Sequence, residues 1–236
     1  MKLGIMQPYF FPYLGYLSLI KQVDAFILFD TVQFIHHGWI ERNRILKPGE
    51  GVQYISVPLI KCPRETKIKD ICLRNNEDWK ERLFKQLMHY KKKAPFYEKT
   101  MDVLRNALDF ETESITCLNQ RTLLSICDYL NIKKKIDVFS KMDIKIEPAN
   151  EPDEWALNIC KALGNVDEYW NPIGGMTFFD SSKYEHAGIK LRFHSVKLEE
   201  YSQRRKSFEK GLSIIDVMMF NSPEKINGML DEYELI

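Results

Sequence analysis

The sequence lacks closely spaced cysteines, long apolar runs and an excess of charge of either sign. Its five cysteines are odd in number and no two lie within three residues, so there is no CxxC zinc or redox motif and a closed disulfide set is not expected. The 34 basic against 33 acidic residues argue against a strongly basic protein that coats nucleic acid. No stretch approaches the roughly 18–20 apolar residues of a membrane helix.

The start of the chain also lacks the features of a secretory signal. The residues MKLGIMQPYFFPYLGY contain one Lys, an early Pro and many aromatic side chains, so we expect a cytoplasmic protein. Over 236 residues, 44% are hydrophobic and 28% are charged, the proportions of a folded protein with a sizeable core. With no repeat, low-complexity segment or clear linker, we expect a single α/β domain over residues 1–236.

Strand-like and helix-like patterns alternate in the first thirty residues. Leu3–Met6 is a short apolar run, Leu14–Ile20 fits the start of a helix, and Ala25–Phe29 is a continuous apolar run. Such runs are typical of strands that are covered on both faces, as in a parallel sheet. The order predicts a βαβ unit and a Rossmann-like α/β fold with a mainly parallel sheet. Further strands are predicted over residues 54–59, 69–73 and 189–198.

The middle section, residues 77–163, is predicted to be largely helical. Apolar positions recur at helical spacing over residues 77–90, 101–108, 115–130 and 153–163. Gly164 is expected to close the last of these helices in the C′ position. Farther on, residues 212–220 fit either an apolar helix or a buried strand.

The segment from Met6 to Tyr16 directly follows the first predicted strand and reads MQPYFFPYLGY. In open α/β sheets, ligands bind at the loops beyond the carboxyl ends of the strands. Aromatic rings there can stack on a sugar or a base, phenol hydroxyls can orient it, and the Gln7 amide can donate and accept. Alternatively, the rings fill the core and the prolines shape the loop.

The segment from Asp30 to Ile45 leaves the second predicted strand at the same edge. Asp30 is a candidate general base, metal ligand or ribose anchor, and His37 can titrate near neutrality. Arg42, with Arg44 beside it, can hold a phosphate or carboxylate, or the two can form a solvated pair. Adjacent histidines face opposite sides of a strand, so we expect no metal site here.

Two later segments carry further polar groups. Asn171-Pro172-Ile173-Gly174-Gly175 has the composition of a turn, and its glycines let backbone approach a ligand or form an ordinary tight turn. The basic run from Arg204 to Lys206 either contacts phosphate or forms a solvated face. Asp216, inside an apolar stretch, is either a functional carboxylate or a structural one paired to a nearby donor.

These blocks together resemble the WbqC-like family. The resemblance rests on MQPYFFPYLGY, on Asp30-x-x-Gln33 with GWxxRN at residues 38–43, on KAPFY at 93–97, on the 171–175 turn, and on Tyr201-x-Gln203 leading to LSIIDVMMFN. The family has a basic residue near positions 36–37, so a phosphate contact made by histidine there would depend on pH. Family members are associated with bacterial O-antigen and surface-polysaccharide genes, which implies sugar or nucleotide-sugar chemistry by context.

A second likeness concerns the first helix. Tyr13 and Tyr16 occupy the places of the histidines in the HxGH motif of HIGH-type nucleotidylyltransferases, which also lies between a first strand and a first helix. This likeness implies a related fold. Tyr carries no positive charge near pH 7, and no ISSTxIR-like segment follows, so adenylyl-transfer chemistry is not implied with it.

We therefore expect a group-transfer enzyme that acts on a nucleotide-activated sugar in bacterial surface-polysaccharide synthesis. The candidate catalytic residues are Asp30, His37 and Arg42. The candidate substrate-binding residues are Gln7, Tyr9, Tyr13, Tyr16, Gln33, Trp39, Asn43, Asn171, Gly174, Gly175 and Tyr201. The alternatives are a nucleotidylyltransferase-like enzyme and a non-catalytic protein that binds a sugar nucleotide or another glycan-synthesis enzyme. The sequence identifies no cofactor, and nucleic acid is not an expected partner.

Overall fold

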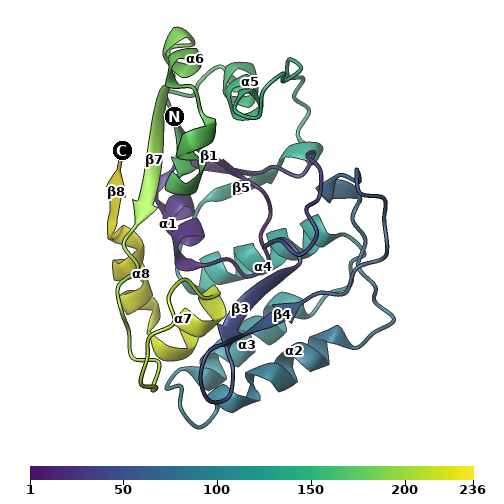
Figure 1. The fold of residues 1–236 in the computed structure, drawn as a ribbon, viewed down its shortest axis with the longest axis vertical. Helices are drawn as coiled ribbons and strands as arrows, with labels where there is room; N and C mark the ends of the chain where they lie inside the picture. Colours follow the sequence, from purple (N-terminus) through teal and green to yellow (C-terminus); the bar gives the residue numbers. More distant parts are fainter.

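A six-stranded sheet forms the centre of the computed structural model, which describes residues 1–236 (Figure 1). Its strands are β1 (Lys2–Met6), β2 (Ala25–Leu28), β5 (Lys135–Val138), β6 (Glu168–Pro172), β7 (Lys190–Val196) and β8 (Tyr233–Leu235). They are arranged in the order β5–β2–β1–β6–β7–β8, and all neighbours pair in parallel except β7 and β8. The predicted mainly parallel, Rossmann-like α/β sheet is confirmed.

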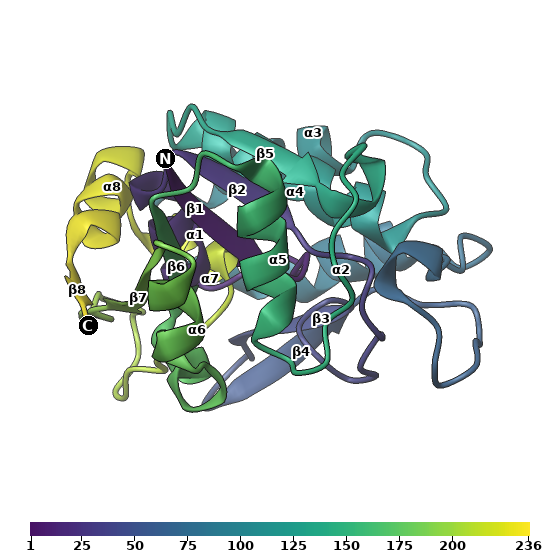
Figure 2. The same ribbon diagram turned by 90° about the horizontal axis from the view of Figure 1, so that it is seen from above.

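Helices cover both faces of this sheet (Figure 2). The helices are α1 (Leu14–Gln22), α2 (Trp79–Leu87), α3 (Tyr97–Leu108), α4 (Ile115–Tyr129), α5 (Glu154–Leu163), α6 (Ser181–His186), α7 (Ile214–Phe220) and α8 (Pro223–Asp231). Helices α5 and α6 pack on one face over a cluster of 13 buried apolar residues. The other helices join a cluster of 47, together with a hairpin of β3 (Arg42–Leu46) and β4 (Val52–Ser56).

The first strands show why the sequence forms a doubly covered sheet. Along β2, Ile27 belongs to the smaller cluster, whereas Phe26 and Leu28 belong to the larger one. Successive side chains of a strand point to opposite faces, so a continuous apolar run supplies both cores. Helix α1, rich in buried apolar residues, then connects β1 to its parallel neighbour β2. The predicted βαβ unit is confirmed.

The strand order creates a crevice between β1 and β6. Counted along the chain, the five parallel strands have the order 3-2-1-4-5, so the connections after β1 and β6 depart in opposite directions. In open α/β sheets this topological switch point, at the carboxyl ends of the strands, is where ligands bind. We call the loop that follows β1, residues 7–13, the aromatic loop.

The structure differs from the sequence prediction in two places. Residues 135–138, within the section predicted as largely helical, form the edge strand β5, because Ile136 and Val138 alternate with polar residues and bury one side of a short strand. Residues 68–70 form a 3₁₀ turn rather than a strand, and Leu59 and Leu73 share only an isolated bridge.

Three further details of the fold are settled. Residues 214–220 form a helix rather than a strand, with Ser213 capping its first turn. Gly164 ends α5 with a left-handed backbone, φ +73°, as predicted. None of the helices has both the length and the apolar composition of a membrane span.

Candidate functional site

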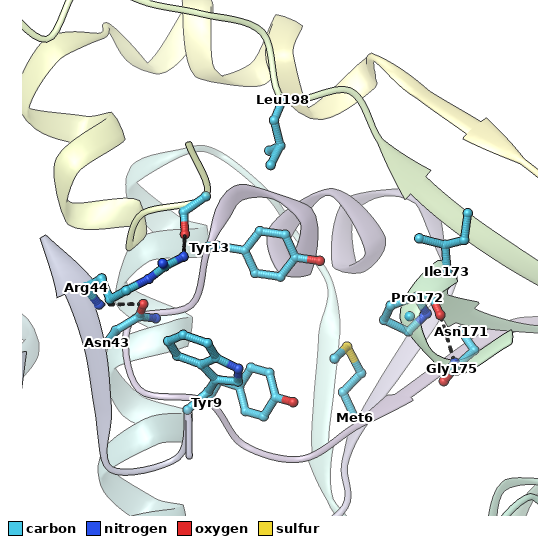
Figure 3. A pocket seen from close by; sticks show the side chains of 13 residues that line it. Met6, Tyr9, Tyr13, Asn43, Arg44, Asn171, Pro172, Ile173, Gly175 and Leu198 are labelled. Carbon is cyan, nitrogen blue, oxygen red and sulfur yellow. Dashed lines mark hydrogen bonds between the residues drawn. The ribbon is translucent and has the colours of Figure 1, made fainter. Parts of the chain in front are cut away.

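An open cleft of about 570 Å³ lies at the switch point (Figure 3). Its size is within the range of small-molecule sites. The aromatic loop and Met6 form one side, the β6 turn (residues 171–175) forms another, and Trp39 and β3 form a third. Leu198 and Gly211 complete it from the roof loop, residues 197–213, which joins β7 to α7. Four segments distant in sequence therefore build one cavity.

The hydroxyls of Tyr9 and Tyr13 point into the cleft (Figure 3). Burial raises the pKa of both phenols, so they are neutral hydroxyls at physiological pH, able to donate and accept. Neither hydroxyl has a hydrogen-bond partner within the chain. Their rings also present apolar faces, which suits a ligand that carries both hydroxyls and a flat or ring-shaped body.

Gly15 determines where the Tyr13 ring lies. A Cβ at position 15 would come within 2.5 Å of the Tyr13 ring and 2.6 Å of its hydroxyl. The glycine, in the first turn of α1, thus leaves the space that the phenol occupies. The backbone φ of Gly15 is not positive, so its conformation does not require glycine. Glycine is needed because a side chain at position 15 would collide with the Tyr13 ring.

Gly15→Ala is therefore expected to reduce ligand binding without loss of stability. Alanine favours a helix over glycine by about 1 kcal/mol, and the displaced group is the free end of a side chain. Thermal unfolding should give an unchanged or higher Tm. Calorimetric titration with a small molecule that binds in the cleft should show weaker binding. Tyr13→Phe is the matched comparison. It removes the hydroxyl but keeps the ring, so it separates loss of the hydroxyl from displacement of the ring. Unchanged affinity in Gly15→Ala would contradict this role for the Tyr13 position.

Hydrogen bonds hold the aromatic loop in an unusual conformation. Phe11 has a positive φ of 41°, which is uncommon for a residue with a Cβ. Asn43 Nδ2 donates to the carbonyls of Phe10 and Phe11 at 3.1 and 2.8 Å, and Ser213 Oγ donates to Phe11 at 2.8 Å. Asn119 Nδ2 donates to the Pro8 carbonyl at 2.8 Å. The loop is thus fixed by buried side chains from β3, α4 and the start of α7.

Arg44 is the charged residue of the cleft. Its guanidinium lies 5.5 Å from the Trp39 ring centroid and donates to the Gly211 carbonyl at 3.3 Å. It forms no ion pair with a carboxylate, and its buried Nε has no partner. A guanidinium that has aromatic and carbonyl neighbours but no counter-ion is suited to an anionic ligand group.

The β6 turn forms the opposite wall. The Asn171 side chain accepts from the Tyr169 hydroxyl at 3.0 Å and donates to the Pro172 carbonyl at 3.0 Å. A Cβ at Gly175 would come within 2.1 Å of the Asn171 amide nitrogen, whereas a Cβ at Gly174 would meet nothing within 4 Å. Gly175 therefore makes room for Asn171, and Gly174 leaves open space at the wall.

Hydrogen bonds to Asp216 of α7 hold the roof loop in place. Its buried carboxylate accepts from the Tyr201 and Tyr90 hydroxyls at 2.6 Å each and from Gln203 Nε2 at 3.1 Å. Desolvation raises the pKa of this carboxyl to about 6, against the opposing effect of the three hydrogen bonds. Because Tyr201 and Gln203 belong to the roof loop, the carboxylate ties that loop to α7 and to Tyr90. Asp216 is thus a structural carboxylate that is paired to nearby donors.

The structure brings together about half of the predicted site residues. The cleft is lined by seven of the predicted substrate-binding residues: Tyr9, Tyr13, Trp39, Asn43, Asn171, Gly174 and Gly175. Of these, Asn43 and Asn171 use their amides to hold backbone, so they shape the walls.

None of the three predicted catalytic residues lines the cleft. Asp30 accepts from the Ser140 hydroxyl at 2.6 Å and the Ser140 amide at 3.0 Å, which ties the end of β2 to the end of β5. His37 lies on an exposed turn near Glu41. Arg42 stacks on Tyr54, 4.3 Å from the ring centroid. Because none of the three lines the cleft, we leave all three out of the proposed site.

Four predicted binding residues also lie outside the cleft. The buried Tyr16 donates its hydroxyl to the Gln7 carbonyl at 2.9 Å, and Gln33 donates to the Arg64 carbonyl at 2.9 Å. Tyr201 is bonded to Asp216, and Gln7 lines a different cavity. No group of three or more His, Cys, Asp or Glu side chains is placed to hold a metal ion.

Sequence reasoning missed the roof of the cleft. Leu198 and Gly211 carry no chemical signal, since a lone leucine and a loop glycine are found at many surfaces. The composition of the 171–175 turn did indicate one wall of the cleft, to which Pro172 and Ile173 of the same turn contribute.

Comparison with known proteins places this chain in a family. A model described as the WbqC-like protein family matches residues 7–228. Over 223 residues the chain is 28% identical to the uncharacterized protein Rv1507c of Mycobacterium tuberculosis, with 93% of each chain covered. No solved structure matches significantly. Because the family match covers nearly the whole chain, the chain belongs to the WbqC-like protein family.

Proposed function

We propose that the cleft binds a nucleotide-activated sugar and that the protein transfers a group from or onto it in bacterial surface-polysaccharide synthesis. The observation that carries the proposal is Arg44, a guanidinium without a carboxylate partner, in the same cavity as Tyr9, Tyr13 and Trp39. The Arg44 guanidinium can pair with a diphosphate. A sugar or a base can stack on the aromatic rings and form hydrogen bonds with the phenol hydroxyls. The polysaccharide context rests on the family resemblance.

The cleft favours stabilisation of charge and orientation of substrate. When a group leaves a nucleoside diphosphate, the bond from that group to the diphosphate oxygen breaks and negative charge develops on the diphosphate. Arg44 would neutralise that charge, in a cavity where fewer water molecules compete. The Tyr9 and Tyr13 hydroxyls would hold the sugar in a defined orientation, which lowers the entropic part of the barrier.

One observation favours a second candidate, a protein that binds the sugar nucleotide without turning it over. No Asp, Glu, His, Lys or Cys is among the residues that line the cleft. A transfer reaction there would therefore pass the acceptor's proton to the departing diphosphate or to water, because no ordinary general base faces the cavity. Binding alone needs no such group.

Thermal unfolding with a panel of nucleoside diphosphate sugars tests the binding step. A ligand at one hundred times its Kd stabilises the folded state by about 2.7 kcal/mol, which is a rise in Tm of about 5–10 °C for a domain of this size. Free nucleoside diphosphates and triphosphates with Mg²⁺ complete the panel. If no nucleotide raises the Tm, the proposal is wrong.

Product analysis then separates the candidates. Incubation of the stabilising sugar nucleotide with acceptor sugars and amines should release a nucleoside diphosphate if the protein transfers the sugar. If it transfers a group onto the sugar nucleotide, incubation with acyl or aminoacyl donors should instead raise the mass of the sugar nucleotide. Binding without product in all mixtures would favour the non-catalytic candidate. Pyrophosphate release from a triphosphate and Mg²⁺ would instead indicate a nucleotidylyltransferase.

A further inference from the structure

A second cavity lies beside the end of β1, next to the amino-terminal end of α5. Its volume is about 460 Å³, and Gln7, Phe29, Val32, Asn150, Glu151 and Trp155 contribute to its lining. We call it the α5 cavity. Gln7 directly follows Met6, which lines the cleft, so adjacent residues of one strand end face two cavities. Both cavities are at the carboxyl edge of the sheet, where α/β proteins bind ligands.

The lining of the α5 cavity combines aromatic surface with free polar groups. The Phe29 and Trp155 rings pack with centroids 5.7 Å apart and form an apolar wall. The Tyr16 hydroxyl fixes the Gln7 carbonyl at 2.9 Å, while the Gln7 side-chain amide makes no hydrogen bond within the chain. An indole face beside an unpaired carboxamide is suited to the C–H faces and hydroxyls of a sugar ring.

The two cavities differ in charge. Arg44 is the charged residue of the cleft, whereas the α5 cavity has Glu151 and no Lys, Arg or His. Glu151 forms no ion pair, and the nearby Lys183 is paired with Asp153 and Glu154 at 3.0 Å. The α5 cavity offers a diphosphate no cation, whereas a neutral sugar can donate hydroxyl hydrogens to the exposed Glu151 carboxylate. The lining of the α5 cavity therefore suits a neutral ligand better than the anionic one that the cleft favours.

We infer that the α5 cavity binds the acceptor, a neutral saccharide, while the cleft binds the nucleotide-activated donor. This inference rests on the proposed function. In the transfer, an acceptor hydroxyl oxygen forms the bond to the transferred group, the bond from that group to the diphosphate breaks, and the hydroxyl proton leaves with the diphosphate. The end of β1, with Met6 in the cleft and Gln7 in the α5 cavity, is where the reacting ends of the two substrates would meet.

Tryptophan fluorescence can assign each ligand to its cavity. Trp79 and Trp170 are each 2% exposed, so Trp39 in the cleft and Trp155 in the α5 cavity are the two accessible indoles. In Trp39→Phe, neutral methyl glycosides and disaccharides at millimolar concentration should change the emission, and nucleoside diphosphates should not. In Trp155→Phe the responses should be reversed.

Matched substitutions test the polar contacts. Gln7→Leu should weaken saccharide binding by about 2–12-fold, the effect of one lost hydrogen bond, and leave the affinity for nucleoside diphosphate unchanged. Arg44→Gln should do the opposite. Far-UV circular dichroism and Tm values that match the wild type would establish that both variants are folded.

The results separate failure of this inference from failure of the proposed function. If saccharides bind at Trp155 and nucleotides bind nowhere, the proposed donor cleft is wrong and the α5 cavity remains a saccharide site. If nucleotides bind at Trp39 but saccharides bind nowhere or compete for that cleft, the inference about the α5 cavity is overturned and the donor site stands.

Discussion

Arg44→Gln is expected to weaken the binding of nucleoside diphosphate sugars by about 10–150-fold, the value of a hydrogen bond to a charged group. The guanidinium of Arg44 has no carboxylate partner, so its charge is available to the ligand rather than to the fold. Isothermal titration calorimetry with the sugar nucleotide that gives the largest rise in Tm measures the loss.

Arg42→Gln is the matched control for this experiment. Arg42 lies two residues earlier on the same strand, so both variants lose one positive charge at nearly the same place. Arg42 stacks on Tyr54 and does not line the cleft. Its substitution should change affinity by less than about threefold, the effect of a screened charge that does not contact the ligand. Equal losses in the two variants would show that only the general positive potential matters, and would contradict a direct contact with Arg44.

Asp216→Asn is expected to remove a pH dependence of stability of about 3 kcal/mol. Burial raises the pKa of this carboxyl from 3.8 to about 6 in the folded protein, and each pKa unit corresponds to about 1.4 kcal/mol. Between these values the folded protein keeps a proton that the unfolded chain has released. The contribution of Asp216 to the free energy of unfolding is therefore complete below about pH 4 and is lost as the pH rises through 6.

Urea unfolding of both proteins from acid to neutral pH measures this contribution. The difference between wild type and variant is the useful quantity, because groups such as His194, whose pKa burial lowers to about 4, titrate equally in both. The wild type should lose stability relative to the variant as the pH rises. A constant difference across this range would mean that Asp216 titrates normally, and that its hydrogen bonds offset the cost of burial.

The elements that could be predicted from sequence are those with strong local patterns. β1 and β2 are apolar runs, and Gly164 ends α5 because its left-handed backbone suits glycine. β5 was missed because a four-residue edge strand with one buried side has too few apolar positions to form a pattern. Short strands depend on their neighbours in the sheet more than on their own sequence.

The site was predicted at the level of segments but not of individual side chains. The aromatic loop and the 171–175 turn were identified, yet Asp30 is bonded to Ser140, which is 110 residues away. The sequence does not show whether a carboxylate at a strand end is free or accepts a hydrogen bond from a residue far away in the chain. Likewise Arg42 and Arg44 share one face of β3, and only the placement of the hairpin against the sheet decides which one reaches the cleft.

The pairing of β1 with β6 has a consequence for how the chain folds during synthesis. β1 and β2 emerge first, but the edge of β1 is completed by residues 168–170 and α1 is covered by α8. At about 5–20 residues per second, roughly 7–40 seconds separate the emergence of β1 and α1 from that of these partners. The apolar surface of α1 stays uncovered during that time. We therefore expect slow folding, since contacts between residues far apart in sequence delay it, and dependence on chaperones that shield nascent chains.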